Sequence, residues 1–263
     1  MKKKLVVGNW KMHLNASEAS TLVHRLDERI KAHRSVEVIL APTMLTLQPM
    51  SVQIDRRKFK LAAQNAYHKD EGAFTGEVSF TMLQDLVHYC LVGHSERRMY
   101  FGETLDSVRD KVSAAVRNDI VPIICIGETR QERRAGETRQ VLHDQLVTAL
   151  ADLTDQDVAN VVIAYEPVWA IGAGDPAKPA QILEATKFIR KQIHDLYGAD
   201  AAEAIRILYG ASVEPEFVGG ILGLGGIDGL LVGGASLNYH KFSAIVDATY
   251  KANVLEHEHG TAE

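Results

Sequence analysis

Cysteine is scarce in this chain, and its two cysteines, Cys90 and Cys125, both lie inside apolar runs. Two cysteines are too few for a disulfide scaffold, so we expect a protein of the reducing cytoplasm. Long apolar runs are missing too. None approaches the ~20 residues of a membrane-spanning helix, which excludes a transmembrane role. The first apolar stretch is broken by Asn9, Trp10 and Lys11, and we expect it to be a strand and not a signal peptide.

A surplus of positive charge is also absent. The chain has 29 Lys and Arg against 34 Asp and Glu, a net charge of -5, whereas nucleic-acid-binding domains are usually basic. We therefore expect no nucleic-acid partner, and any bound anion must be held by local groups. The sequence has no Walker motif, no paired Cys-x-x-Cys and no His-Glu-x-x-His. We accordingly expect neither cofactor nor metal.

The chain does contain a regular alternation of two apolar patterns. Short β-branched runs recur about every 32 residues, the length of one βα unit with its loops; they begin at residues 5, 36, 59, 89, 121, 161, 205 and 229. Several are apolar on both faces, as parallel strands covered on both sides are. Helical patterns lie between them, such as the apolar stripe of Leu22, Leu26 and Ile30.

Eight βα units fit either a closed (β/α)8 barrel or a doubly wound open sheet, both of the α/β class. We predict the barrel because eight units nearly exhaust the chain and no Pro/Gly/Ser-rich linker divides it. The barrel is expected to form one domain over residues 1–255. Residues 256–263 have no apolar periodicity, which is typical of a flexible C-terminal tail.

Polar residues and glycines gather just after the predicted strands, where a parallel barrel places its chemistry. The candidates follow strands one, four, six, seven and eight: Asn9 and Lys11, His94, Ser95 and Glu96, Glu166, Ser212, and Gly233 and Gly234. Each alone has a structural explanation as a loop start, a turn or a buried histidine. Together they predict one site with a carboxylate base and donors that stabilise an oxyanion, which suits proton abstraction next to a carbonyl.

Two local features sharpen this hypothesis. Gly233 and Gly234 open the loop into the last helix, where backbone N–H groups can approach a phosphate closely, although a tight turn without a ligand is the alternative. His94 precedes a predicted helix start at Ser95. Because the positive end of a helix disfavours imidazolium, we expect His94 to be neutral.

Five strings resemble triosephosphate isomerases: GNWKM at 8–12, VGHSERR at 92–98, AYEPVWAIG at 164–172, YGASV at 209–213 and LVGGASL at 231–237. They occur in the family's order, with AAQN, GAFTGEVS, FGET and CIGE between them, and cover the chain up to its tail. The resemblance implies a homodimeric (β/α)8 barrel of glycolysis and gluconeogenesis. It also implies interconversion of dihydroxyacetone phosphate and D-glyceraldehyde 3-phosphate through an enediolate, without cofactor or metal.

The resemblance also implies residue roles. Glu166 would shuttle the proton between two carbons and His94 would polarise the carbonyl oxygens, while Lys11 and Asn9 would bind the substrate and stabilise the enediolate. Ser95 and Glu96 would support these catalytic residues, with Glu96 close to the lysine. The family's phosphate contacts fall on Gly172, Ser212, Gly233 and Gly234.

Residues 167–177 resemble the family's mobile lid, which keeps water from the enediolate. After Ala-Ile-Gly the family usually has Thr-Gly-Lys, whereas this chain continues with Ala173, Gly174, Asp175 and Pro176. Proline fixes its own φ and restricts the residue before it. We therefore expect the second hinge of the lid to sample fewer conformations here.

GAFTGEVS, residues 72–79, resembles the family's long loop that enters the neighbouring subunit, and a long loop in a compact domain is usually functional. We predict a two-fold homodimer, with these contact residues: Gln64, Asn65, Phe74, Thr75, Glu77 and Arg98. Two other readings stay open. One is another phosphate-binding barrel enzyme, although a Schiff-base aldolase would need a lysine inside a late strand, which the sequence lacks. The other is a rate-impaired isomerase-like scaffold that acts as a binding protein.

Overall fold

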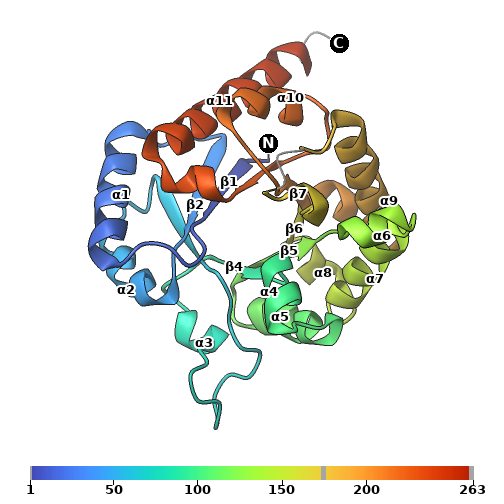
Figure 1. The fold of residues 1–263 in the computed structure, drawn as a ribbon, viewed down its shortest axis with the longest axis horizontal. Helices are drawn as coiled ribbons and strands as arrows, with labels where there is room; N and C mark the ends of the chain where they lie inside the picture. Colours follow the sequence, from blue (N-terminus) through green and yellow to red (C-terminus); the bar gives the residue numbers. More distant parts are fainter. Residues whose placement is uncertain (1, 173–175, 261–263) are drawn as a thin grey trace.

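Eight parallel strands close into a barrel in the computed structural model, which describes residues 2–172 and 176–260 (Figure 1). The strands are β1 (Lys4–Asn9), β2 (Val36–Ala41), β3 (Phe59–Ala63), β4 (Tyr89–Val92), β5 (Val121–Ile126), β6 (Val162–Tyr165), β7 (Arg206–Tyr209) and β8 (Gly229–Val232). They pair in chain order, and β8 closes the barrel by pairing Leu5 with Gly229. The predicted (β/α)8 barrel is confirmed, and every strand begins within one residue of its expected position.

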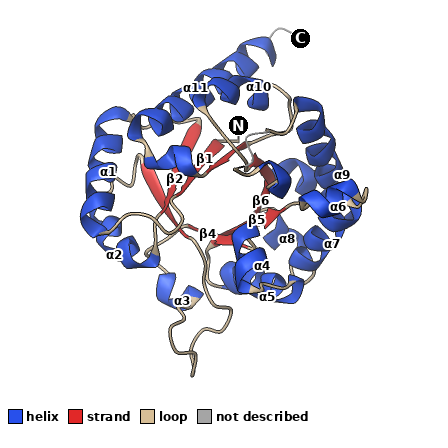
Figure 2. Cartoon of the chain, viewed as in Figure 1, coloured by secondary structure: helices blue, strands red, loops and turns tan. Residues whose placement is uncertain are grey.

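Helices form a ring outside the strands (Figure 2). They are α1 (Ala16–Arg29), α2 (Met44–Gln53), α3 (Phe80–Leu83), α4 (Ser95–Phe101), α5 (Leu105–Arg117), α6 (Arg130–Arg134), α7 (Thr138–Leu150), α8 (Asp155–Val158), α9 (Pro179–Ala204), α10 (Val218–Leu222) and α11 (Tyr239–Gly260). Short 3-10 turns are η1 (Val168–Ala170), η2 (Pro215–Phe217) and η3 (Gly234–Leu237). Helix α9 is two helices joined at Gly198, whose φ of 84° is not helical.

The core has two apolar layers because the strands are apolar on both faces. Side chains such as Val7, Ile39 and Leu91 fill the barrel interior. The opposite strand faces pack against helical residues such as Leu26 and Ile189. This double burial explains why the sequence shows continuous apolar runs in place of alternation.

All strands run in one direction, so the loops after their carboxyl ends meet at one mouth of the barrel. The loop between β3 and α3 extends away from it (Figure 1). At the other end of the chain, α11 stays helical to Gly260, past the domain boundary expected at 255. That boundary and the flexible tail stay predictions, and residues 261–263 lie outside the described part. None of the described helices is both long and apolar enough to cross a membrane.

Candidate active site

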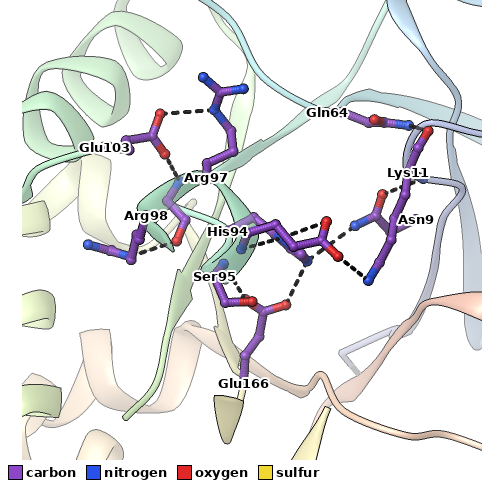
Figure 3. A network of polar contacts seen from close by, with 11 residues as sticks. Asn9, Lys11, Gln64, His94, Ser95, Arg97, Arg98, Glu103 and Glu166 are labelled. Carbon is purple, nitrogen blue, oxygen red and sulfur yellow. Dashed lines mark hydrogen bonds and ion pairs between the residues drawn. The ribbon is translucent and has the colours of Figure 1, made fainter. Parts of the chain in front are cut away.

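Side chains from three strand ends converge at this mouth (Figure 3). His94 Nε2, after β4, lies 3.0 Å from Oε1 of Glu166, after β6. Asn9 Nδ2, at the end of β1, lies 3.3 Å from the same Nε2. These three residues, together with Lys11 and Gly233, line a cavity of about 30 Å³. The parallel topology thus brings the predicted base, histidine and lysine to one place.

His94 occupies the N-cap of α4, where the backbone N–H of Glu96 donates to Nδ1 at 3.3 Å. Nδ1 therefore carries no proton, and a neutral ring holds its proton on Nε2, facing Glu166. Burial disfavours the imidazolium form, but the Glu166 carboxylate outweighs burial and raises the pKa of His94 above its ordinary value. The predicted helix start is present, yet its downward effect on that pKa is opposed by Glu166.

Glu166 is 3% exposed, and the Ser95 N–H donates to its Oε2 at 3.2 Å. Burial favours the protonated acid. His94, the Ser95 N–H and Lys11 together outweigh burial and hold the pKa of Glu166 below its ordinary value. Glu166 is therefore a carboxylate at neutral pH, the form that a general base requires.

Lys11 reaches the site from a left-handed backbone conformation with φ of 52°. Its N–H donates to Asn9 Oδ1 at 3.0 Å, and Gln64 Nε2 donates to its carbonyl at 2.8 Å. These bonds hold a conformation that non-glycine residues seldom adopt. An ion pair of 2.6 Å with Glu96 Oε1 holds the Lys11 ammonium. Glu96 therefore lies beside the lysine, as the resemblance implied.

The predicted phosphate-binding residues lie on loops around the cavity. A Cβ added to Gly233 would lie 3.7 Å from Lys11 Cε, and Gly234 begins η3. Ser212 Oγ donates to the Ala170 carbonyl at 3.2 Å, and Gly172 has φ of 66°. Of these residues, Gly233 lines the cavity with the catalytic candidates. Phosphate binding by the four stays a prediction.

The expected lid is described only in part. Ala173, Gly174 and Asp175 lie outside the described residues, and Pro176 is exposed. The effect of the Asp175–Pro176 pair on the second hinge therefore stays a prediction. The segment begins at Pro167, directly after Glu166, and continues into η1.

Glu128, a residue that sequence reasoning missed, holds η1. Its carboxylate is fully buried at the end of β5. It accepts hydrogen bonds from Trp169 Nε1 at 2.8 Å, from the Tyr165 hydroxyl at 3.2 Å and from Arg133 Nη1 at 3.1 Å. The available signal was a charged residue two positions after the apolar run at 121–126. Glu128 follows strand five, whereas the site residues predicted from the sequence follow strands one, four, six, seven and eight.

Two glycines that were not predicted as site residues make room for Glu166. A Cβ added to Gly127 would lie 1.7 Å from the Glu166 carbonyl oxygen. One added to Gly210 would lie 3.1 Å from Glu166 Cγ. Neither site tolerates a larger residue without a shift of Glu166, so the close approach of these two glycines limits where Glu166 can lie.

The predicted dimer residues fall into two groups. Arg98 bonds within this chain, where Nε donates to the Gly93 carbonyl at 2.7 Å. Asn65 likewise accepts from Lys111 Nζ at 2.8 Å, and Gln64 bonds Lys11 as described above. By contrast, Phe74, Thr75 and Glu77 are exposed on the projecting loop. Within residues 2–172 and 176–260, no group of three or more His, Cys, Asp or Glu is placed to hold a metal ion.

The amino-acid sequence of this chain is similar to those of known proteins. The family model described as triosephosphate isomerase matches residues 4–249. The triosephosphate isomerase of Citrifermentans bemidjiense is 46% identical over 247 residues, which cover 94% of this chain and 98% of that protein. Those of Geobacter metallireducens and Caldanaerobacter subterraneus are 45% and 44% identical, over 96% and 94% of this chain and 100% of each relative. The chain belongs to the triosephosphate isomerase family.

Proposed function

We propose that this enzyme interconverts dihydroxyacetone phosphate and D-glyceraldehyde 3-phosphate through an enediolate, with Glu166 as the base. The contact of 3.0 Å between His94 Nε2 and Glu166 Oε1, in a cavity that Lys11 also lines, carries this proposal. The site places the buried, deprotonated carboxylate of Glu166 beside the N–H donor of His94 and the positive charge of Lys11. These are the groups that proton abstraction next to a carbonyl needs.

The reaction is a relocation of protons. Glu166 takes a proton from C1 of the ketone, and the electron pair of that C–H bond moves to form the enediolate with negative charge on the C2 oxygen. The His94 Nε2–H and the Lys11 ammonium stabilise that charge. Glu166 then returns the proton to C2, while the hydroxyl proton of the C1 oxygen passes through His94 to the C2 oxygen, so that C1 becomes the aldehyde and C2 carries the hydroxyl group. No oxidant, reductant or cofactor is consumed.

The substrate phosphate is proposed to bind at Gly172, Ser212, Gly233 and Gly234. Glycines let backbone N–H groups approach an anion closely, and Lys11 adds charge on the side of Gly233. Local groups of this kind are necessary because the chain as a whole carries a charge of -5.

We further propose a two-fold homodimer. A cavity of about 480 Å³ lies beside the catalytic site, and Lys11, Met12, Gln64, Glu96 and Phe101 are part of its lining. Met12 and Phe101 are 92% and 68% exposed, and large apolar side chains exposed on one face indicate an interface. The projecting loop around Thr75 from a second copy is the proposed occupant, and two-fold symmetry makes the contact reciprocal.

The proposed dimer can be tested by the mass of the protein in solution. Sedimentation equilibrium at micromolar concentration is expected to give twice the chain mass of 29.0 kDa. Thr75→Arg, at the tip of the loop, is expected to shift the protein toward single chains because it adds a charge where the loop would be buried. A wild type that sediments as a single chain would refute the dimer.

Turnover of D-glyceraldehyde 3-phosphate by the purified chain, in an assay coupled to reduction of the ketone product, tests the proposed function. Sustained turnover supports it. A folded chain that binds the triose phosphate without converting it would favour the binding scaffold instead. A cytoplasmic location is part of the proposal, supported by two buried free thiols.

A further inference from the structure

We propose that Arg130, the first residue of α6, is a positioning residue for the reaction. It holds the turn that follows the catalytic base. The inference rests on the proposed function, because the role of Arg130 is to fix where the Glu166 carboxylate lies. Neither the resemblance nor the site residues predicted from the sequence include this arginine.

The contact that carries the inference is a charge-assisted hydrogen bond. Arg130 Nη2 donates to the Trp169 carbonyl oxygen at 2.8 Å. Trp169 is the middle residue of the three-residue turn η1, three positions after Glu166. The last carbonyls of so short a turn have no partner within it and need a donor from outside the turn. Arg130 satisfies the Trp169 carbonyl from α6.

Trp169 is held on other sides as well. Its Nε1–H donates to Glu128 Oε1 at 2.8 Å, and the Arg133 guanidinium lies over its ring at 4.2 Å. Residues after β5 and in α6 therefore contact Trp169 at its carbonyl, at its indole N–H and on the face of its ring. These contacts hold η1 in the orientation that the structure shows.

The same turn is tied to the reacting groups at both ends. The Val168 N–H donates to the Glu128 carbonyl at 3.1 Å, next to the close approach of Gly127 to the Glu166 carbonyl. At the far end, Ala170 accepts from Ser212 Oγ at 3.2 Å. A shift of η1 therefore moves the base directly and also disturbs the loop that holds Ser212.

Arg130 is the member of this group that is open to test. Its side chain is exposed, whereas Glu128 and Trp169 are buried and their replacement would disturb the fold. We expect Arg130→Ala to lower kcat about 3- to 10-fold with a smaller change in KM, because misplacement of a base by a fraction of an ångström slows proton transfer. Arg130→Lys keeps the charge and one donor, and is expected to recover most of the loss.

The matched control is Arg134→Ala, which removes the same charge from the last residue of the same helix. Arg134 is also exposed, and its substitution is expected to leave kcat unchanged. A second readout is the kinetic isotope effect on kcat with D-glyceraldehyde 3-phosphate deuterated at C2. Slower proton transfer raises this effect in Arg130→Ala, whereas loss of folded enzyme lowers the rate without changing it.

If Arg130→Ala has the same kcat and the same isotope effect as the wild type, the positioning role is overturned. An equal loss in Arg134→Ala would also overturn it, since net charge and not the Trp169 contact would then be responsible. A lower rate with an unchanged isotope effect would assign Arg130 to stability alone. In each case the wild type still turns over, whereas a folded wild type without turnover contradicts the proposed function, so the two failures are distinguishable.

Discussion

Glu166→Asp is expected to lower kcat about 100-fold or more while KM changes little. The substitution keeps a carboxylate but shortens the side chain by one methylene, which withdraws the base from the substrate by roughly 1 Å, and a misplacement of that size is worth ~100-fold. The side chain cannot compensate by moving, because Gly127 and Gly210 fit closely around the backbone and Cγ of Glu166. Steady-state kinetics in the coupled assay give kcat and KM separately.

Glu184→Asp is the matched control. Glu184 is an exposed residue of α9 that pairs with Arg139 at 3.1 Å, so the same shortening there should leave kcat unchanged. A Glu166→Asp enzyme with wild-type kcat would show that Glu166 is not the base. Circular dichroism measures the fraction of folded protein. If that fraction falls as much as kcat does, the substitution acts through the fold.

His94→Gln is expected to lower kcat about 100-fold, because the amide N–H does not take the place of the His94 Nε2–H and the loss of one well-placed oxyanion donor has an effect of this size. It is also expected to shift the pH profile. Burial alone would raise the pKa of Glu166, and His94 is the foremost of the groups that hold it below its ordinary value. The base works in its deprotonated form, above its pKa. Without His94 that pKa rises, and the acid limb of kcat/KM in the free enzyme moves to higher pH.

His88→Gln provides the comparison for this experiment. His88 is exposed and directly precedes β4, at the opposite end of the strand that His94 follows. It should change neither kcat nor the acid limb. An acid limb that stays in place in His94→Gln would contradict the proposed coupling between His94 and Glu166.

The barrel was predictable because its sequence pattern follows directly from its packing. Parallel strands buried on both faces need continuous apolar runs, and each must be followed by a helix before the next strand can pair. The positions of Asn9, His94 and Glu166 then follow from topology alone, since the carboxyl ends of parallel strands meet at one mouth. Lys11 and Gly233 were found by the same rule.

The remaining contacts depend on packing that no local pattern records. In the sequence Glu128 looks like an ordinary loop carboxylate. Its contacts with Trp169 and Tyr165 become visible only in the folded structure. The need for glycine at Gly127 arises from a neighbouring strand end about forty residues away in sequence. The positive φ of Lys11 is likewise stabilised by Gln64 from another loop, and a sequence gives no sign of that bond.

The most direct test of the central claim, that Glu166 carries one proton between two carbons of the substrate, is conversion of dihydroxyacetone phosphate by the wild-type chain in D2O. A carboxylate that holds the proton while the enediolate exists exchanges it with solvent in part of the turnovers. We therefore expect D-glyceraldehyde 3-phosphate to form and a substantial fraction of it to carry deuterium at C2, measured by NMR. Product in which C2 carries only protium would contradict proton transfer through a carboxylate that exchanges with solvent.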